Sequence, residues 1–423
     1  MPTQSTAKLP IISWCLFDWA IGPFPVLITT FIFGTYFTEK VAVDKIIGTT
    51  QWGEAHGFAG LVIALLSPIF GAIADHEGRR KPWLRILVPL IFISATVLWF
   101  VKPSSDYVTW ALFWVILGTI AVEISTVFYN AMLKDLAPPH FLGRLSGWGW
   151  ACGYAGGLVA LILTLHLFIL NDRAWLGLDT ATAEQVRICG PLVGIWVIAF
   201  FWPLFAFTPD HPSTGIGFVR ATHIGLKSLT STFKLLSREY KNILLFLLAR
   251  MFYIDGLATV FAFGGIYAAG AFGMSIAEVI QFGIGMNVAA GIGAALMGWL
   301  DDSRGPRITI FCALLLMIFC GLGILLVHKV LWFWILGMGL SLGVGPVQAA
   351  SRSLLIRIAP PHLINELFGL YNFSGKVTSF MGPWVLALLT SFFSSQRAGM
   401  SSAFVFMVIG GILLIFVKVH NSR

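Results

Sequence analysis

The sequence predicts an all-α polytopic membrane protein in which twelve transmembrane helices form two pseudosymmetric six-helix bundles. Three observations support this prediction: an apolar composition, twelve apolar runs, and landmarks of the first half that recur in the second. Hydrophobic residues make up 57% of the 423 residues and charged residues only 11%. A water-soluble protein must expose much of its surface to water, so this composition indicates a chain embedded in lipid.

Apolar runs of the length that a bilayer requires occur twelve times. A helix needs about 20 apolar residues to cross the hydrocarbon core. Runs bounded by Gly, Pro or charged residues lie at 11–38, 55–74, 83–101, 107–135, 141–170, 188–208, 242–270, 277–299, 307–327, 330–358, 363–393 and 400–419. Twelve such helices leave short connections and no room for a large water-soluble domain.

An internal repeat relates the two halves. The matching landmarks are Ala137-Pro138-Pro139-His140 with Ala359-Pro360-Pro361-His362, Gly147 with Gly369, Gly153 with Gly375, and a GxxxDxxG frame at 71–78 and at 298–305. Because they recur in the same order, we expect six-helix bundles over 1–208 and 242–423, joined by a cytoplasmic linker over 209–241. Part of this linker, GLKSLTSTFKLLSREYK, is either an amphipathic helix on the membrane surface or a plain connection. The stretch 171–187 is expected to be an outer loop with a short helical piece.

The net charge of +8 follows the predicted topology. Of the 27 Lys and Arg residues, seventeen fall on the side that holds both termini, seven on the other side, and three within helices. Cytoplasmic loops are enriched in Lys and Arg, so both termini are expected in the cytoplasm. No basic patch interleaved with aromatic residues suggests a nucleic-acid partner.

Enzyme motifs do not occur in the sequence. There is no GxSxG, HExxH or phosphate-binding Walker loop, and no His/Cys cluster with the spacing of metal ligands. The five cysteines lack paired spacing and predict neither a disulfide framework nor a metal site. We therefore expect no catalytic residues, no cofactor and no bound metal.

Two sets of segments resemble a known family. The loop GAIADHEGRRK at 71–81 is similar to the signature loop of the major facilitator superfamily, and 298–307 to its second copy. Further segments resemble one branch, the vacuolar amino-acid effluxers linked to autophagy and their bacterial relatives: SWCLFDWA at 13–20, LGRLSGWGWACGY at 142–154, DG at 255–256, VQAASRS at 347–353 and FGLYNFSGK at 368–376. The resemblance implies proton-linked transport of amino acids or related small carboxylate-bearing solutes. From the duplicated halves we expect alternating access, and we expect a monomer in a bacterial cytoplasmic membrane.

Cations inside the helices are the candidates for substrate binding, because charges at membrane depth are costly and usually face a cavity or a partner. Lys376 suits a carboxylate, and its alternative role is a permanent salt bridge to Glu123 or Asp255. Arg352 has the same two readings. The other candidates for the substrate cavity are Asn372, Gln348, Tyr371 and Asn130.

Acidic residues inside the helices are the candidates for proton coupling, in the order Asp255, Glu123, Asp18. Burial favours the protonated form of a carboxyl group and a neighbouring cation favours the carboxylate, so alternation between such environments moves a proton. For Asp18 a helix-end contact or an ion pair with a basic residue is an equal alternative. Arg250 and Asp255 lie five residues apart, on different helix faces, and are not expected to pair with each other.

The repeated GxxxDxxG loops predict a conformational latch in which a carboxylate caps a helix of the other half. The candidate gating residues are Asp75, Arg79, Arg80, Asp302, Arg307 and Arg250; the alternative for the loops is simple topology signalling. Trp14, Trp19, Trp148 and Trp150 are expected in the interfacial aromatic belt. An alternative function is a non-transporting receptor or assembly partner that docks through 209–241.

Overall fold

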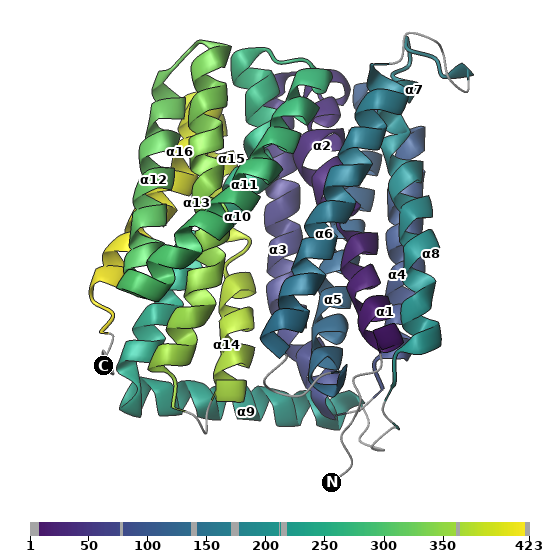
Figure 1. The fold of residues 1–423 in the computed structure, drawn as a ribbon. Helices are drawn as coiled ribbons and strands as arrows, with labels where there is room; N and C mark the ends of the chain where they lie inside the picture. The colour runs from purple at the N-terminus through teal and green to yellow at the C-terminus, as the bar shows by residue number, and fades with distance from the viewer. Residues whose placement is uncertain are drawn as a thin grey trace. The chain divides into compact units, whose positions relative to one another are not determined.

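The computed structural model describes residues 8–76, 79–136, 142–170, 177–210, 212, 218–360 and 364–418. These residues fold as helices joined by short connections (Figure 1). Twelve helices or helix runs within them are long and apolar enough to cross a membrane, which confirms the predicted fold class. Helices suit this setting because each backbone polar group is satisfied within its own segment, and lipid offers no other partner.

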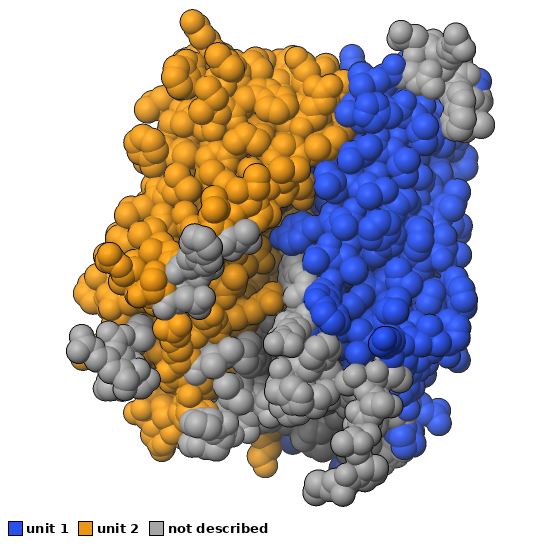
Figure 2. Space-filling view, in the orientation of Figure 1, with its two compact units in different colours: residues 1–43, 65–226 blue, residues 44–64, 227–423 orange. Residues whose placement is uncertain are grey.

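Contacts between Cα atoms divide the chain into two compact units, coloured separately in Figure 2. Unit 1 comprises residues 1–43 and 65–226, and unit 2 comprises residues 44–64 and 227–423. Helix α3 (Lys45–His76) therefore contributes its first part to unit 2 and its second part to unit 1. The domain boundaries expected at 208 and 242 stay a prediction.

Unit 1 contains the first, third, fourth, fifth and sixth spans together with the second part of α3. Its main helices are α1 (Lys8–Ile21), α4 (Lys81–Val97), α5 (Val108–Leu136), α6 (Leu142–Thr164) and α8 (Cys189–Phe207). Helix α1 packs on α6 and α8, while α4 packs on α5 and α8. The connection between the fifth and sixth spans contains the short helix α7 (Glu184–Arg187), as expected for that stretch.

The first span is longer and less regular than predicted. It continues past α1 through a π-helix (Phe24–Phe31), α2 (Phe33–Tyr36) and a second π-helix (Phe37–Val41). Pro23 and Pro25 interrupt the backbone hydrogen bonds at this point, since proline has no N–H group to donate. The span therefore runs from Lys8 to Val41 rather than ending near residue 38.

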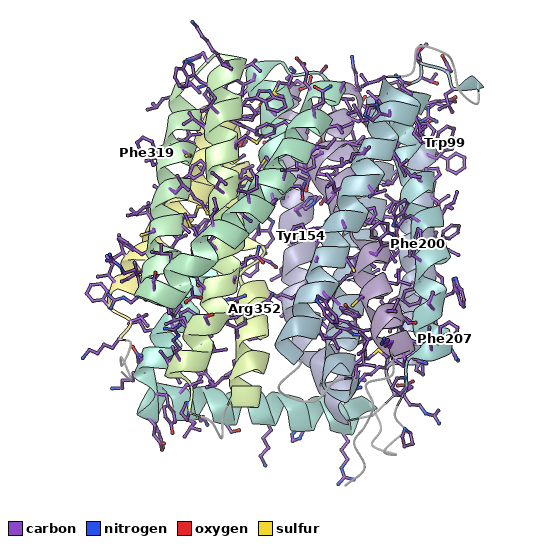
Figure 3. The ribbon with its side chains drawn as sticks, in the orientation of Figure 1. Trp99, Tyr154, Phe200, Phe207, Phe319 and Arg352 are labelled. Carbon is purple, nitrogen blue, oxygen red and sulfur yellow. The ribbon has the colours of Figure 1, made fainter. Side chains whose placement is uncertain are left out.

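Unit 2 contains the last six spans. Its helices are α10 (Lys241–Phe272), α11 (Ile276–Arg304), α12 (Pro306–Leu326), α13 (Val330–Ile358), α14 (Ile364–Val377), α15 (Met381–Phe393) and α16 (Gln396–Ile415). A Ser275–Glu278 capping box begins α11, and Pro306 occupies the first turn of α12. Large apolar side chains on outer faces, such as Phe319 on α12 (74% exposed; Figure 3), suit contact with lipid.

The eleventh span is broken, which the sequence analysis did not predict. Helix α14 ends at Val377, a turn occupies 378–380, and α15 begins at Met381. The amide of Met381 donates to Thr378 O at 2.8 Å across the turn. Pro383 lies in the first turn of α15, where its missing N–H group costs nothing. The span thus consists of two pieces with free helix ends between them.

The first part of α3 packs inside unit 2. A Cβ atom at Gly57 would collide with the ring of Trp384, and one at Gly60 would lie 2.8 Å from Phe380 N. Gln396 Nε2 donates to Thr49 Oγ1 at 2.7 Å. Small residues therefore bring α3 against α15 at backbone distance.

Helix α9 (Phe218–Glu239) lies in the linker predicted over 209–241. Tyr240 alone separates it from α10. Exposed residues recur along it at helical spacing: Arg220, His223, Lys227, Ser231, Lys234 and Arg238. One face of α9 is therefore basic.

Candidate functional site

Two side chains of opposite charge on α10 are buried against the broken eleventh span. Arg250 is 9% exposed and Asp255 is 3% exposed. Arg250 contacts α14, before the break, and Asp255 contacts α15, after it. The break therefore lies between the two points at which α10 presents a charge.

Arg250 binds only neutral groups in the described part of the chain. Its Nη1 donates to Tyr371 O at 2.7 Å and to Ser374 Oγ at 3.1 Å. The guanidinium carbon lies 3.6 Å from the centroid of the Tyr371 ring, which is a cation–π contact. Buried Nε has no hydrogen-bond partner there. Gly375 makes this approach possible, because a Cβ atom would lie 2.8 Å from Nη1.

Asp255 belongs to α10, and its carboxyl group lies at the N-terminus of α15. Its Oδ2 accepts a hydrogen bond from Gly382 N at 3.0 Å. A carboxylate is stabilised at this end of a helix by the free N–H groups and the helix dipole. Its Oδ1 is buried and has no hydrogen-bond partner among the described residues. A Cβ atom at Gly382 would collide with Thr259 Oγ1 and lie 3.2 Å from Asp255 Oδ1.

The two charges do not neutralise each other. Their hydrogen bonds go to different partners, as expected from their spacing. A buried charge without an opposite charge is destabilising unless other groups compensate it. Within the ranges that the structure describes, α10 thus holds a guanidinium group and a carboxyl group that each keep one buried polar atom without a hydrogen bond.

The other substrate candidates of unit 2 lie on α13 and α14. Lys376, in the last turn of α14, and Arg352 and Gln348, on α13, are half-buried; Figure 3 labels Arg352. Tyr371 is buried beneath the guanidinium of Arg250. The side chain of Asn372 lies outside the described residues.

Asp18 of unit 1 has a partner that the sequence analysis missed. Tyr129 donates its hydroxyl hydrogen to Asp18 Oδ2 at 2.7 Å, so the Asp18 side chain is bonded to a neutral phenol rather than to a helix end or a basic residue. Trp14 stacks on the Tyr129 ring at 4.2 Å and donates from Nε1 to Tyr129 O at 3.1 Å. Trp14 is only 2% exposed, so its expected place in the interfacial belt is wrong. On α5, Glu123 is half-buried and Asn130 is exposed.

The first GxxxDxxG loop leads into a contact between α4 and α8. The side chain of Asp75 lies outside the described residues, and Arg79 is exposed. The amides of Arg80 and Lys81 donate to Asp210 Oδ1 and Oδ2 at 3.0 and 3.2 Å, and Lys81 Nζ donates to Phe205 O at 2.8 Å. A carboxylate thus caps the start of α4 while a cation binds the carbonyl end of α8.

A corresponding contact occurs after the second loop. Arg307, at the start of α12, donates from Nη2 to Ile415 O, the last residue of α16. Asn242 exchanges two hydrogen bonds of 2.7 Å with the backbone of Lys418. The side chain of Asp302 is not described, but neighbouring Asp301 pairs with Arg357 at 3.6 Å. In both units a cation of the third helix therefore binds the carbonyl end of the sixth.

His56 is a further residue that the sequence analysis did not single out. Its Nδ1 lies 3.0 Å from Trp52 O, so the ring donates there. Its Nε2 is buried without a hydrogen-bond partner in the described ranges. A single histidine inside an apolar helix gives no local signal, because its surroundings come from α10 of the same unit, where its ring meets Phe263 edge-on.

Comparisons with known proteins agree on the family. Residues 140–423 match the family described as "Vacuole effluxer Atg22 like", and residues 3–161 match the Major Facilitator Superfamily. An uncharacterised MFS-type transporter, YxiO of Bacillus subtilis (strain 168), is 27% identical over 417 residues, which cover 97% of this chain and 95% of that protein. Autophagy-related protein 22 of Candida glabrata is 24% identical over 315 residues, which cover 66% of this chain but only 55% of that protein.

Solved structures show the same fold. A bacterial homologue of the human lysosomal transporter Spinster, inward-facing and unoccupied, matches with a TM-score of 0.71 at 16% identity over 98% of both chains. A D-xylose–proton symporter matches with a TM-score of 0.69 at 15% identity over 97% of both chains. The chain belongs to the Atg22-like vacuole effluxer family, within the major facilitator superfamily of membrane transporters.

Proposed function

We propose that this integral membrane protein of the transporter superfamily is a secondary active transporter that moves amino acids, or related small carboxylate-bearing metabolites, by proton-coupled alternating access. The observation that carries the proposal is the pair Arg250 and Asp255, both buried and each bonded to neutral groups among the described residues. A membrane protein retains such charges where they bind ions or substrates. The name of the family, an effluxer, supports the transport of a small solute.

The proposed roles follow the chemistry of each side chain. Lys376 and Arg352 bind the carboxylate of the substrate, and the polar side chains that complete the cavity are Asn372, Gln348, Tyr371 and Asn130. Asp255, Glu123 and Asp18 carry the proton, in that order of importance. The loops after the second and eighth spans gate the inner mouth. We further propose a monomer in a cytoplasmic membrane with both termini in the cytoplasm.

Flux through proteoliposomes tests this function. Vesicles containing the purified full chain are loaded with a mixture of unlabelled amino acids, and the uptake of each labelled amino acid is followed with and without a pH gradient. We expect counterflow of at least one amino acid, a several-fold acceleration by the gradient, and loss of that acceleration with a protonophore. The Lys376→Ala and Asp255→Asn variants lower uptake at least tenfold, whereas Arg238→Met, on exposed α9, does not.

Three results separate the alternatives. Counterflow that is indifferent to the gradient contradicts proton coupling but not transport. Unchanged flux in both Lys376→Ala and Asp255→Asn contradicts the proposed roles of these two residues. Binding of amino acids without any counterflow indicates a receptor with a transporter fold.

A further inference from the structure

The cations of helix α9 lie in one row along its surface. Arg220, Lys227, Lys234 and Arg238 are spaced seven, seven and four residues apart. Seven residues of an α-helix make nearly two full turns, so the four positions lie within about 40° of one another around the axis, and the row is about 27 Å long. Enrichment of Lys and Arg on one side of a membrane protein does not require them to share a helix face. The alignment therefore needs an explanation of its own.

The side chains of this row differ in their contacts from other cations at the same ends of the spans. Arg220, Lys234 and Arg238 are exposed and make no hydrogen bond or ion pair with other described residues through their side chains. By contrast, Lys81 and Arg307 bind backbone carbonyl groups at helix ends. The cations of α9 are thus accessible to a partner outside the described part of the chain.

The opposite face of α9 is apolar. Leu226, Leu229, Phe233 and Leu236 recur at three- and four-residue spacing, about half a turn away from the row of cations. Leu236 is fully buried, whereas Phe233 is 55% exposed. A helix with Lys and Arg on one face and Phe and Leu on the other is typical of segments that lie in the membrane interface. Its apolar face reaches the acyl boundary, and its basic face lies among the phosphate groups.

The connection to α10 keeps α9 at the membrane surface. Helix α10 forms a membrane span that begins at Lys241. Tyr240 alone precedes it, and its φ of −125° and ψ of 48° are not helical, so the axis changes direction there. The second part of α9 belongs to the same unit as α10, and Figure 1 shows the two axes running in different directions. The headgroup layer extends about 5–8 Å beyond the hydrocarbon, less than the diameter of a helix. The end of α9 therefore lies in this layer.

We propose that the basic face of α9 binds the phosphate groups of anionic phospholipids in the adjacent leaflet. Aligned Lys and Arg residues at a membrane surface each add to the attraction for anionic headgroups. Glu239 is the single acidic residue in 218–241, so this attraction is almost unopposed. Phospholipid is favoured over an acidic protein because α10 holds α9 beside the bilayer permanently. The assignment does not depend on which solute the protein transports.

Native mass spectrometry of the purified full chain in detergent tests the lipid preference. Binding of 1-palmitoyl-2-oleoyl-phosphatidylglycerol is compared with binding of the corresponding phosphatidylcholine at two salt concentrations. We expect the wild-type chain to prefer phosphatidylglycerol at least tenfold at low salt, and less at high salt because ions screen exposed charges. The triple variant Arg220→Gln/Lys234→Gln/Arg238→Gln lowers the affinity for phosphatidylglycerol at least tenfold and leaves that for phosphatidylcholine unchanged.

A matched control removes three exposed cations from other parts of the chain. The variant Lys40→Gln/Lys102→Gln/Lys329→Gln retains the preference for phosphatidylglycerol. The double variant Arg220→Lys/Arg238→Lys also retains it, because it keeps every charge. Both triple variants melt at the wild-type temperature in detergent without added phospholipid, which shows that loss of lipid binding is not loss of folding.

Four results overturn the proposal. The first is equal affinity of the wild-type chain and the α9 triple variant for phosphatidylglycerol, and the second is an equal loss in the control variant. The third is displacement of the lipid by inorganic phosphate more effectively than by chloride at equal ionic strength, which indicates a site for a free anion. The fourth is binding of poly-L-glutamate but not of phosphatidylglycerol, lost in the α9 variant, which indicates an acidic protein partner. Since no flux is measured, failure of the transport proposal leaves this test unaffected.

Discussion

Tyr129, on the fourth span, donates a hydrogen bond of 2.7 Å to the carboxylate of Asp18, on the first span. The bond joins residues 111 positions apart and lies under the stacked rings of Trp14 and Phe17. A carboxyl group held by a phenol in an apolar setting depends on that one donor. This polar contact thus links the first and fourth spans of unit 1, and the apolar sequence around the two residues gives no sign of it.

Replacement of Tyr129 by Phe removes the donor and leaves Asp18 partly buried without its bond. A buried polar group that loses its partner costs about 1–3 kcal/mol, so we expect a lower melting temperature of the detergent-solubilised chain. Tyr107→Phe, in the short 3₁₀-helix (Ser105–Tyr107) at the start of the same span, is the matched control. A melting temperature equal to that of the control would show that Asp18 finds another partner.

Replacement of Gly382 by Ala places a methyl group where Thr259 Oγ1 and Asp255 Oδ1 lie. Crowding in a packed interior typically costs about 1–3 kcal/mol, so we expect a lower melting temperature and a loss of transport. Gly264→Ala, on α10, meets no atom within 4 Å and leaves both unchanged. The second substitution Thr259→Ala in the Gly382→Ala background restores part of the stability; if it restores none, the collision is not the cause.

Replacement of Gly57 by Ala tests the contact between α3 and α15, because the new methyl group collides with the Trp384 ring. We expect a loss of stability of about 1–3 kcal/mol, measured by denaturant titration in detergent. Gly71→Ala provides a control in the same helix, since nothing lies within 4 Å of its Cβ position. Equal effects of the two substitutions would mean that helix propensity, not packing, dominates.

Replacement of Lys81 by Met removes the cation from the carbonyl end of α8, and Arg307→Met does the same for α16. A cation at a helix C-terminus contributes about 0.3–1 kcal/mol, and up to about 2 where it is partly buried. We expect each variant to melt a few degrees lower, and the half-buried Lys81 to matter at least as much as Arg307. Arg220→Met, exposed on α9, serves as the control for charge loss alone.

The spans could be predicted because lipid imposes one requirement, a long apolar helix, on every one of them. The irregular parts of the helices could not be predicted from the sequence. Pro23 and Pro25 mark the π-helical part of the first span only in retrospect, since many membrane helices tolerate proline. The break at 378–380 lies beside the hydrogen bond from Gly382 N to Asp255 of another helix, a contact between residues 127 positions apart, and such a contact has no local signal in the sequence.

The charged residues of the candidate site were identified, but their partners were not. Asp255 and Arg250 both fall within the apolar run 242–270, so the sequence predicts that they lie inside a helix of the membrane. Partners depend on tertiary packing, so Tyr129 for Asp18, Asp210 for the start of α4, and the Tyr371 ring for Arg250 came only from the structure. Conversely, Asn130, a candidate for the substrate cavity, is exposed on α5. The sequence of an apolar run does not determine toward which side a polar residue points.

The interruption at 378–380 has a mechanical consequence for the eleventh span. A continuous helix is stiff, because each of its backbone hydrogen bonds resists bending. The regular helical hydrogen bonds are interrupted between Val377 and Met381, so the span bends more easily there. Helix α15 packs against the glycine face of α3, so we expect any bending of this span to move α14 relative to α15 about the turn.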